Sequence, residues 1–252
     1  MSGGYAWRDR NPSPDEVERL RLILSAFKDG SGNVRAPDGR TRADWRQVER
    51  AVAECFGGEA TEAKGIFDVL IEPEDGKPFG LSVKTSQRRK DGRVLMELAN
   101  PAAQLKAAAE VDQVDWETDP EGSGGSLLRT ITSWHDAQRP TVDVERSSYV
   151  VLTHDREKTR YQLFRFPLRL PDPDALSWSQ RESRGRTIVG KEDDETLIEF
   201  YPWSGGQVKF FPQGDSAIWR SSSFELETPP ATSLTRRAAE YWPEKWQRAG
   251  GA

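Results

Sequence analysis

The sequence predicts an α/β fold in which a mixed central β-sheet is flanked by helices. Three observations support this prediction: apolar residues recur at helical spacing in two early segments, short apolar runs of strand length begin near residue 66, and turn residues separate those runs. Early helices followed by late strands are typical of this class. The chain of 252 residues can bury a substantial core, and we expect one domain over residues 1–252.

The first helix is expected to begin after Ser13 and to end at Gly30. Ser13 suits a helix cap, a proline follows in the first turn, and a glutamate stands three residues after the cap. A second helix, capped by Thr41 or Asp44, is expected to end at Gly57. Its expected apolar stripe consists of Trp45, Val48, Val52, Cys55 and Phe56.

Strands are expected next, at residues 66–71 and 79–85, with turn material between them. An Asp-Gly pair at residues 91–92 signals a hairpin, so residues 94–98 are expected to form a third strand or the lead-in to a helix over 101–111. Residues 112–146 show no clear pattern and contain a flexible EGSGG segment. Later strands between residues 147 and 226 are expected to complete the sheet.

Composition excludes several classes of protein. No apolar run approaches the roughly 18 residues of a membrane span, and the N-terminus lacks a signal pattern, so we expect a cytoplasmic protein without membrane contact. The single cysteine, Cys55, excludes an internal disulfide, and two histidines, His135 and His154, argue against a multi-histidine zinc site. A net charge of -5 argues against binding nucleic acid over the whole surface, although bases concentrate between Lys84 and Arg93.

One acid lies inside an apolar strand. Asp68 interrupts the run at residues 66–71, and a charge removed from water needs a partner. A hairpin centred on Asp75 places Asp68 opposite Ser82 with Lys84 as the diagonal neighbour. A second hairpin at residues 91–92 would place Glu97 opposite Ser86, on the face that carries Lys84. A slip of one residue would separate these side chains.

Two carboxylates and a lysine in one place indicate a metal-dependent site. Carboxylate oxygens suit Mg²⁺, which takes one or two protein carboxylates together with water and phosphate. Such a metal polarises a phosphate and activates water. A nearby lysine can orient or deprotonate the attacking water, or hold the phosphate.

The segments GIFDVLI and FGLSVKTS resemble the core of the PD-(D/E)xK nuclease superfamily, whose usual pattern is an Asp on one strand and acid-x-Lys on the next. Ser82 stands at the acid position, which departs from this pattern. One branch of type II restriction endonucleases shares the departure: it reads Ser-x-Lys and recruits a Glu about a dozen residues downstream. Glu97 lies 13 residues after Lys84. The resemblance covers about 35 of the 252 residues.

The resemblance implies a restriction-endonuclease-like core over about residues 42–112. It implies Mg²⁺ bound by Asp68 and Glu97, with Lys84 acting on the water. Members often add a glutamate from an upstream helix, for which Glu49 is the first candidate and Glu54 and Glu62 compete.

That branch also reads guanines with basic residues between the Lys and the Glu. Arg88, Arg89, Lys90 and Arg93 occupy this stretch, but the branch's Arg/acid/Arg order is not reproduced, so its recognition sequence does not carry over. A second basic loop contains Arg181, Arg184 and Arg186.

Each candidate also has an ordinary structural interpretation. Asp68 would then be an acid at a sheet edge, Lys84 a solvated lysine, and Glu97 an acid favoured by the N-terminus of the following helix. The basic residues would be solvated turns.

The combined pattern favours a Mg²⁺-dependent type II restriction endonuclease that cuts double-stranded DNA at a short sequence. Cutting both strands of a symmetric site requires two active sites, so a homodimer is expected. Alternatives are a repair or structure-specific nuclease of the same superfamily, and a DNA-binding protein of the same fold without catalysis, which the serine at position 82 favours.

Overall fold

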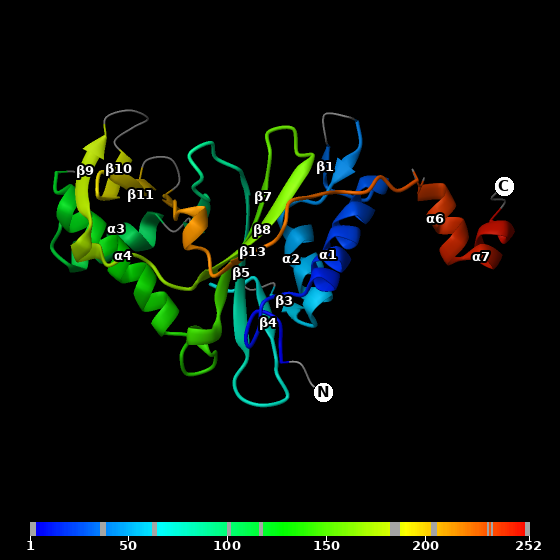
Figure 1. Ribbon diagram of the computed structural model, residues 1–252, viewed down its shortest axis with the longest axis horizontal. Helices are drawn as coiled ribbons and strands as arrows, with labels where there is room; N and C mark the ends of the chain where they lie inside the picture. Colours follow the sequence, from blue (N-terminus) through cyan, green and yellow to red (C-terminus); the bar gives the residue numbers. More distant parts are fainter. Residues whose placement is uncertain are drawn as a thin grey trace.

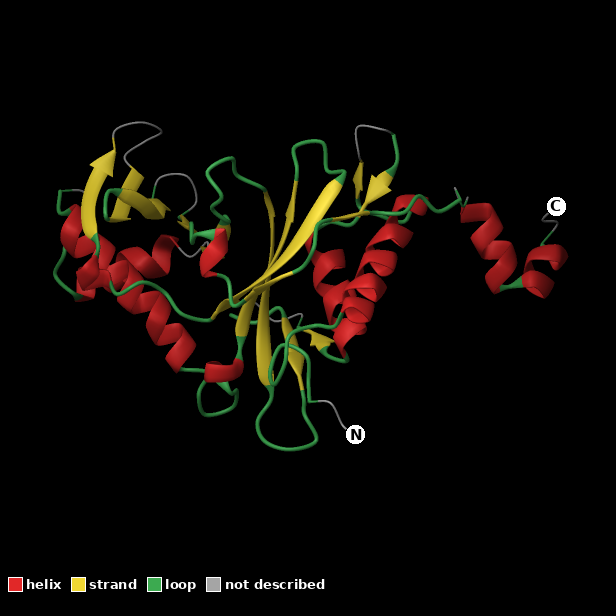
Figure 2. Cartoon of the chain, in the orientation of Figure 1, coloured by secondary structure: helices red, strands yellow, loops and turns green. Residues whose placement is uncertain are grey.

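The structure of the chain is a computed structural model. It describes residues 4–35, 39–61, 65–99, 102–115, 118–181, 187–202, 206–230, 232 and 234–249. A central β-sheet lies between two sets of helices (Figure 1). Helices α1 (Pro14–Ala26) and α2 (Trp45–Phe56) cover one side, and α3 (Ala102–Val111) and α4 (Pro120–Asp136) lie on the other, together with a second sheet (Figure 2). The predicted α/β class is therefore confirmed.

Both early helices begin and end where local sequence predicts. Ser13 accepts the backbone N–H of Glu16 at 3.2 Å and caps α1, which continues through the 3₁₀ turn η1 (Phe27–Asp29) to Gly30 at φ 108°. Asp44, and not Thr41, caps α2, and Gly57 at φ 71° ends it. The left-handed backbone conformation at these two positions favours glycine, because it is strained for residues that carry a Cβ atom.

The apolar stripe of α2 differs from the prediction at its first residue. Val48, Ala51 and Val52 are buried against the sheet, whereas Trp45 is 55% exposed. Trp45 is the first helical residue, and Arg46 lies over its ring at 4.8 Å from the centroid.

The central sheet has seven strands in the order β13-β8-β7-β5-β4-β3, with β14 also paired to β8. Strands β5 and β7 are parallel and all other pairs are antiparallel. The strands are β3 (Glu59–Ala60), β4 (Val69–Ile71), β5 (Phe79–Gln87), β7 (Ser148–His154), β8 (Arg160–Pro167), β13 (Trp219–Arg220) and β14 (Phe224–Glu225).

Strands β7 and β8 are buried on both faces. Alternate residues of β7 enter different cores: Val150 and Leu152 pack with α1 and α2, and Tyr149 and Val151 pack with α4 and the second sheet. Residues of β8 divide in the same way. Because side chains of a strand alternate between its two faces, this one layer of strands contributes residues to both apolar cores.

The second sheet has five strands in the order β6-β12-β11-β10-β9. They are β6 (Met96–Ala99), β9 (Ser177–Arg181), β10 (Thr187–Glu192), β11 (Glu195–Tyr201) and β12 (Gln207–Phe210). The expected hairpin between residues 79–85 and 94–98 is therefore wrong: β6 pairs with β12. The side chain of Met96 on β6 is buried in the core of the second sheet together with Val208 and Phe210 of β12, which explains this pairing.

Residues 120–136, which had no clear pattern in the sequence, form the helix α4. The EGSGG segment lies in its first turns and is not a flexible linker. Asp119 caps the helix by accepting Gly122 N at 2.9 Å, and Pro120 fills the first turn. The glycines allow Trp178 to approach, because a Cβ on Gly124 would lie 2.1 Å from its ring.

The remaining elements are short. The β1–β2 hairpin consists of β1 (Val34–Arg35) and β2 (Thr41–Arg42), and the other 3₁₀ turns are η2 (Val144–Arg146), η3 (Pro173–Ala175) and η4 (Gly214–Ser216). Helices α6 (Leu234–Tyr241) and α7 (Pro243–Arg248) project from the side of α1 (Figure 1). In the described part of the chain, no helix has the length and hydropathy needed to cross a bilayer.

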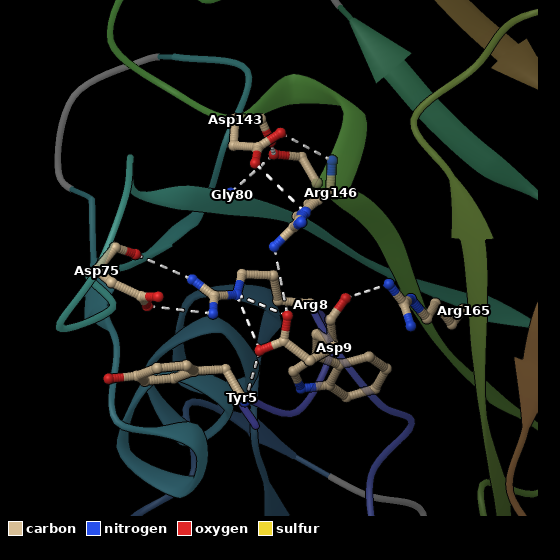
Figure 3. Close-up of polar contacts among 10 residues, drawn as sticks. Tyr5, Arg8, Asp9, Asp75, Gly80, Asp143, Arg146 and Arg165 are labelled. Atoms are coloured by element: carbon tan, nitrogen blue, oxygen red, sulfur yellow. Dashed lines mark hydrogen bonds and ion pairs between the residues drawn. The ribbon is translucent and has the colours of Figure 1, made fainter. Parts of the chain in front are cut away.

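The N-terminal segment is fastened to the starts of β5 and β7 (Figure 3). Arg8 bonds Asp9 and Asp75, and Asp9 also meets Arg146 at 3.4 Å. Arg165, 9% exposed, donates to the Trp7 carbonyl and, at 3.0 Å, to Ser148 Oγ. Burial lowers the pKa of Arg165. The N-terminal segment therefore seals one end of the sheet.

The packing of α4 predicts opposite effects for two neighbouring glycines. Gly124→Ala should lower the free energy of unfolding by about 1–3 kcal/mol, because its methyl group would overlap the Trp178 ring. Gly125→Ala meets only the end of the Arg129 side chain at 3.0 Å and should be neutral or stabilise by up to about 1 kcal/mol, since alanine favours helix. Urea unfolding of both variants measures this, and equal effects would contradict the packing argument.

Candidate functional site

Asp68 stands where β4 stops pairing with β5. Val69 pairs with Leu81, so Asp68 is opposite Ser82, in the predicted register. The backbone N–H of Asp68 still donates to Leu81 O at 3.0 Å. The next donor of β5, the N–H of Val83, is accepted by the side chain of Asp68, with Oδ2 at 2.7 Å, and not by the backbone of β4. The side chain thus satisfies a backbone donor that β4 no longer reaches.

Lys84 completes an ion pair with this carboxylate. Its Nζ lies 2.9 Å from Asp68 Oδ2 and also donates to Val83 O at 3.1 Å. The two side chains are 18% and 21% exposed, so the pair is shielded from solvent but accessible. The predicted diagonal contact between Asp68 and Lys84 is therefore confirmed.

Ser82 occupies the position at which the resembled family usually has an acid. It is 3% exposed, and its hydroxyl donates to Asp68 Oδ2 at 3.4 Å. Oδ2 therefore has three donors, whereas Asp68 Oδ1 has no hydrogen bond among the described residues. Ser82 orients the carboxylate and leaves its second oxygen available.

Glu49 of α2 is the third ionisable group at this place. It is half-buried and makes no hydrogen bond within the described ranges. Burial raises its pKa to about 7, with a further upward contribution from the charge of Asp68 and a downward one from Lys84. Among the competing glutamates, Glu54 is exposed on the same helix and Glu62 lies outside the described residues.

Glu97 does not occupy its predicted position opposite Ser86. It is exposed on β6, where its cross-strand neighbour is Lys209 of β12. Strand β6 contacts β5, but no hydrogen bond or ion pair of the described residues joins Glu97 to Asp68 or Lys84. The structure therefore brings together Asp68, Lys84 and Glu49, and leaves Glu97 in the second sheet.

The first basic segment is organised by an acid. Asp91 pairs with Arg89 at 2.8 Å and with Arg93 at 3.2 Å, and the Arg89 guanidinium lies 5.0 Å from the centre of the Phe211 ring. The hydrogen bond from Arg89 is the main cause that lowers the pKa of Asp91 to about 2. Arg88 and Lys90 are exposed and have no side-chain partner in the described part of the chain.

The sequence predicts only a turn at Asp91. Its spacing between two arginines, Arg89-x-Asp91-x-Arg93, is the signal that could have revealed its role. In the second basic segment, Arg181 pairs with Glu199, while Arg184 and Arg186 lie outside the described residues.

The donor set fits a hard divalent cation. Asp68 Oδ1 and the Glu49 carboxylate are two oxygen donors without hydrogen-bond partners among the described residues, and Mg²⁺ needs only one or two protein carboxylates besides water and phosphate. No cluster of three or more metal-ligating His, Cys, Asp or Glu side chains occurs within those residues. The ammonium of Lys84 lies beside the same carboxylate and can bind a phosphate or orient water.

Comparison of the chain with protein-family models, curated proteins and solved structures found no match. Its chemistry is therefore argued from the site alone.

The pKa of Glu49 predicts a pH-dependent stability. A folded-state pKa near 7 exceeds the unfolded value of about 4.5, so the stabilisation from the bound proton is complete below pH 4.5 and is lost as pH rises through 7. The unfolding free energy of the wild type, measured with EDTA present, should fall between pH 5 and pH 7 relative to Glu49→Gln.

Glu54→Gln, an exposed change on the same helix, should retain the wild-type slope. Parallel pH profiles for wild type and Glu49→Gln would show that Glu49 titrates near its ordinary value.

Proposed function

We propose that the protein is a Mg²⁺-dependent endonuclease that hydrolyses phosphodiester bonds of double-stranded DNA. The observation that carries the proposal is the Asp68–Lys84 ion pair at the end of β4 pairing, with the raised-pKa carboxyl of Glu49 beside it. Perturbed carboxyls beside a lysine are typical of functional sites.

Asp68, Glu49 and Lys84 have different roles in the proposed reaction. Asp68 Oδ1 and the Glu49 carboxylate would hold the metal, and a bound Mg²⁺ would supply Lewis-acid chemistry toward the phosphate and water. Ser82 and the Val83 N–H fix the Asp68 carboxylate through Oδ2. Lys84 orients the attacking water or binds a phosphate oxygen. Glu97, the ligand that the family resemblance implies, remains the alternative second ligand.

The finer proposal is a type II restriction endonuclease with a restriction-endonuclease-like core. It rests on the Asp68…Ser82-x-Lys84 motif and on the hairpin that brings these residues together. A symmetric DNA site has one scissile bond in each strand, so the enzyme would act as a homodimer with two active sites.

The basic segment after β5 is proposed to contact DNA. Asp91 holds Arg89 and Arg93 in one group, and an arginine held in place can bind guanine through two parallel hydrogen bonds. Exposed Arg88 and Lys90 suit contacts to phosphate. Arg181, Arg184 and Arg186 of the second basic segment are proposed for the same role from their charge in the sequence alone.

The second candidate function is a DNA-binding protein without catalysis. The observation that favours it is Ser82, a neutral residue where an acidic metal ligand is usual. Plasmid digestion with and without Mg²⁺ separates the possibilities: discrete fragments indicate a restriction enzyme, smearing indicates a nonspecific nuclease, and bound but intact DNA indicates a binding protein.

Removing either member of the ion pair should abolish cleavage. Asp68→Ala removes a metal ligand and Lys84→Ala removes the group that acts on the water, so each should reduce the rate by about 100-fold or more while leaving DNA binding largely intact. Gel-shift titration and single-turnover cleavage of the same duplex measure both effects. Cleavage at the wild-type rate by either variant would refute the site assignment.

The second metal ligand can be identified by comparing two glutamates. Glu49→Gln should lower cleavage by about 100-fold, because it removes a carboxylate beside Asp68. Glu97→Gln should lower it less than about tenfold if the ligand pair is Asp68 and Glu49, whereas the family resemblance predicts a loss of about 100-fold. Glu54→Gln is the matched control on α2. The larger loss identifies the ligand, and Mg²⁺ titration of each variant should show the same order.

A further inference from the structure

The C-terminal helices carry an exposed apolar stripe. Helices α6 and α7, residues 234–249 and here called the arm, lie apart from the body of the molecule (Figure 1). Leu234, Ala238, Tyr241 and Trp242 recur in the arm at the spacing of one helical face and form the stripe. Leu234 is 78% exposed, Tyr241 66% and Trp242 56%. Three large apolar side chains on one face of the arm are therefore in contact with water.

The arm is too short to hold its structure through local interactions. Helix α6 has eight residues and α7 has six, whereas isolated helices shorter than about 12–15 residues are marginal in water. The ion pair between Arg236 and Glu240, at 2.9 Å, is exposed and contributes little. A partner that buries the stripe would stabilise both helices.

A concave apolar site lies on the body. This groove has a volume of about 240 Å³ and is bounded by the β1–β2 hairpin, the start of α2 and the ends of β5 and β7. Eight of its twelve lining residues are apolar or aromatic, including Trp45, which is 55% exposed. Grooves of this character receive the large side chains of amphipathic helices.

The polar residues of the groove favour a peptide over a charged small molecule. Burial is the main cause that lowers the pKa of His154, so its ring is neutral at neutral pH, and Arg42 and Asp44 line the groove with opposite charges. Arg42 Nε is buried and has no hydrogen-bond partner in the described part of the chain. Buried donors need an acceptor, and a peptide segment supplies acceptors together with apolar side chains.

The arm is held away from the groove of its own copy. Leu226 lines the groove, and the chain then continues along α1 and η1. Glu227 N donates to Ser25 Oγ at 2.9 Å, and Thr232 N donates to Asp29 O at 3.3 Å. These bonds fix the segment between the groove and the arm, so the arm cannot turn back into this groove without breaking them.

Charge favours the body of another copy as the partner. The arm contains four basic and two acidic residues, whereas the rest of the chain contains 32 basic and 39 acidic residues. A basic arm is attracted to an acidic body and repelled by a second arm. In a twofold dimer each arm can reach the groove of the other copy, so one contact is made twice.

We propose that two copies of this chain exchange arms, with the stripe of each arm seated in the groove of the other copy. Tyr241 and Trp242 are the anchoring rings, and Trp45 of the receiving copy packs against them. The inference names the interface of the homodimer that the proposed function requires and in this respect rests on it, but it uses no residue of the candidate nuclease site.

Sedimentation equilibrium of the full chain tests the exchange. At about 50 µM the wild type should have twice the chain mass of 28.4 kDa. Leu234→Ser and Trp242→Ser should each raise the Kd of the dimer at least about 100-fold, because an anchor contributes at least about tenfold and a twofold dimer loses it twice. Val111→Ser, on α3, removes a side chain that is 81% exposed and should change the Kd less than about twofold.

A mixing experiment identifies the groove as the receiving site. Thr85→Trp, at an exposed position that lines the groove, should block it and give monomers. A mixture of Thr85→Trp and Trp242→Ser restores one contact, because the first variant has an intact arm and the second an intact groove. The mixture should therefore associate at least about tenfold more tightly than either variant alone. Circular dichroism checks that each variant is folded.

Several results would overturn the proposal. A wild type that stays monomeric at about 50 µM would do so, as would dimers of Leu234→Ser and Trp242→Ser as tight as the wild type. A Thr85→Trp dimer would place the arms on another surface, and a mixture no tighter than its components would exclude the exchange. Plasmid cleavage separates this inference from the proposed function: an arm-dependent dimer that leaves DNA intact supports the exchange and contradicts the nuclease, whereas a monomer that cuts DNA does the opposite.

Discussion

The parallel pairing of β5 with β7 is the constraint on which the rest of the structure depends. Parallel strands cannot be joined by a tight turn, so the chain between them must make a long crossover. Residues 88–147 make it, and they contain the basic segment, β6, α3 and α4. The crossover builds its own core on the far face of the sheet and places β6 in a second sheet, where it pairs with β12.

The elements that depend on neighbouring residues could be predicted from the sequence. The cap of α1 and the positive-φ glycines at its end and at the end of α2 could be predicted, since each depends on a few neighbouring residues. The pairing of Asp68 with Ser82 and Lys84 was also predictable, because a short turn fixes the hairpin register and a buried acid requires a donor.

The remaining features depend on residues distant in the sequence. Whether the Asp-Gly turn at residues 91–92 makes a hairpin depends on β12, a strand far away in the sequence that pairs with β6, and this pairing places Glu97 away from its predicted position. The helical state of EGSGG depends on Trp178, which packs on Gly124. The sequence offers Glu49, Glu54 and Glu62 as the upstream glutamate of the candidate site, and the orientation of α2 on the sheet determines which of its glutamates lies near Asp68 and Lys84.

Arg165 is a buried cation whose partners among the described residues are all neutral. Its guanidinium bonds the Trp7 carbonyl, Asn11 Oδ1 and Ser148 Oγ, and so joins the N-terminal segment to β7 and β8. A carboxylate partner would strengthen the attraction, but the planar fork of arginine suits three separate oxygen acceptors. Its contribution is one of geometry, since it specifies how the N-terminal segment enters the sheet.

The crossover between β5 and β7 also affects the rate of folding. The β4–β5, β7–β8 and β10–β11 pairs join strands close in sequence and can form early, whereas Leu81 and Ser148 must meet across more than sixty intervening residues. Contacts of such high sequence separation slow folding, because the chain entropy of loop closure is lost before the contacts compensate for it. Until that contact forms, the backbone N–H and C=O groups along one edge of β5 lack their partners, and it is then that the chain is most exposed to aggregation with other copies.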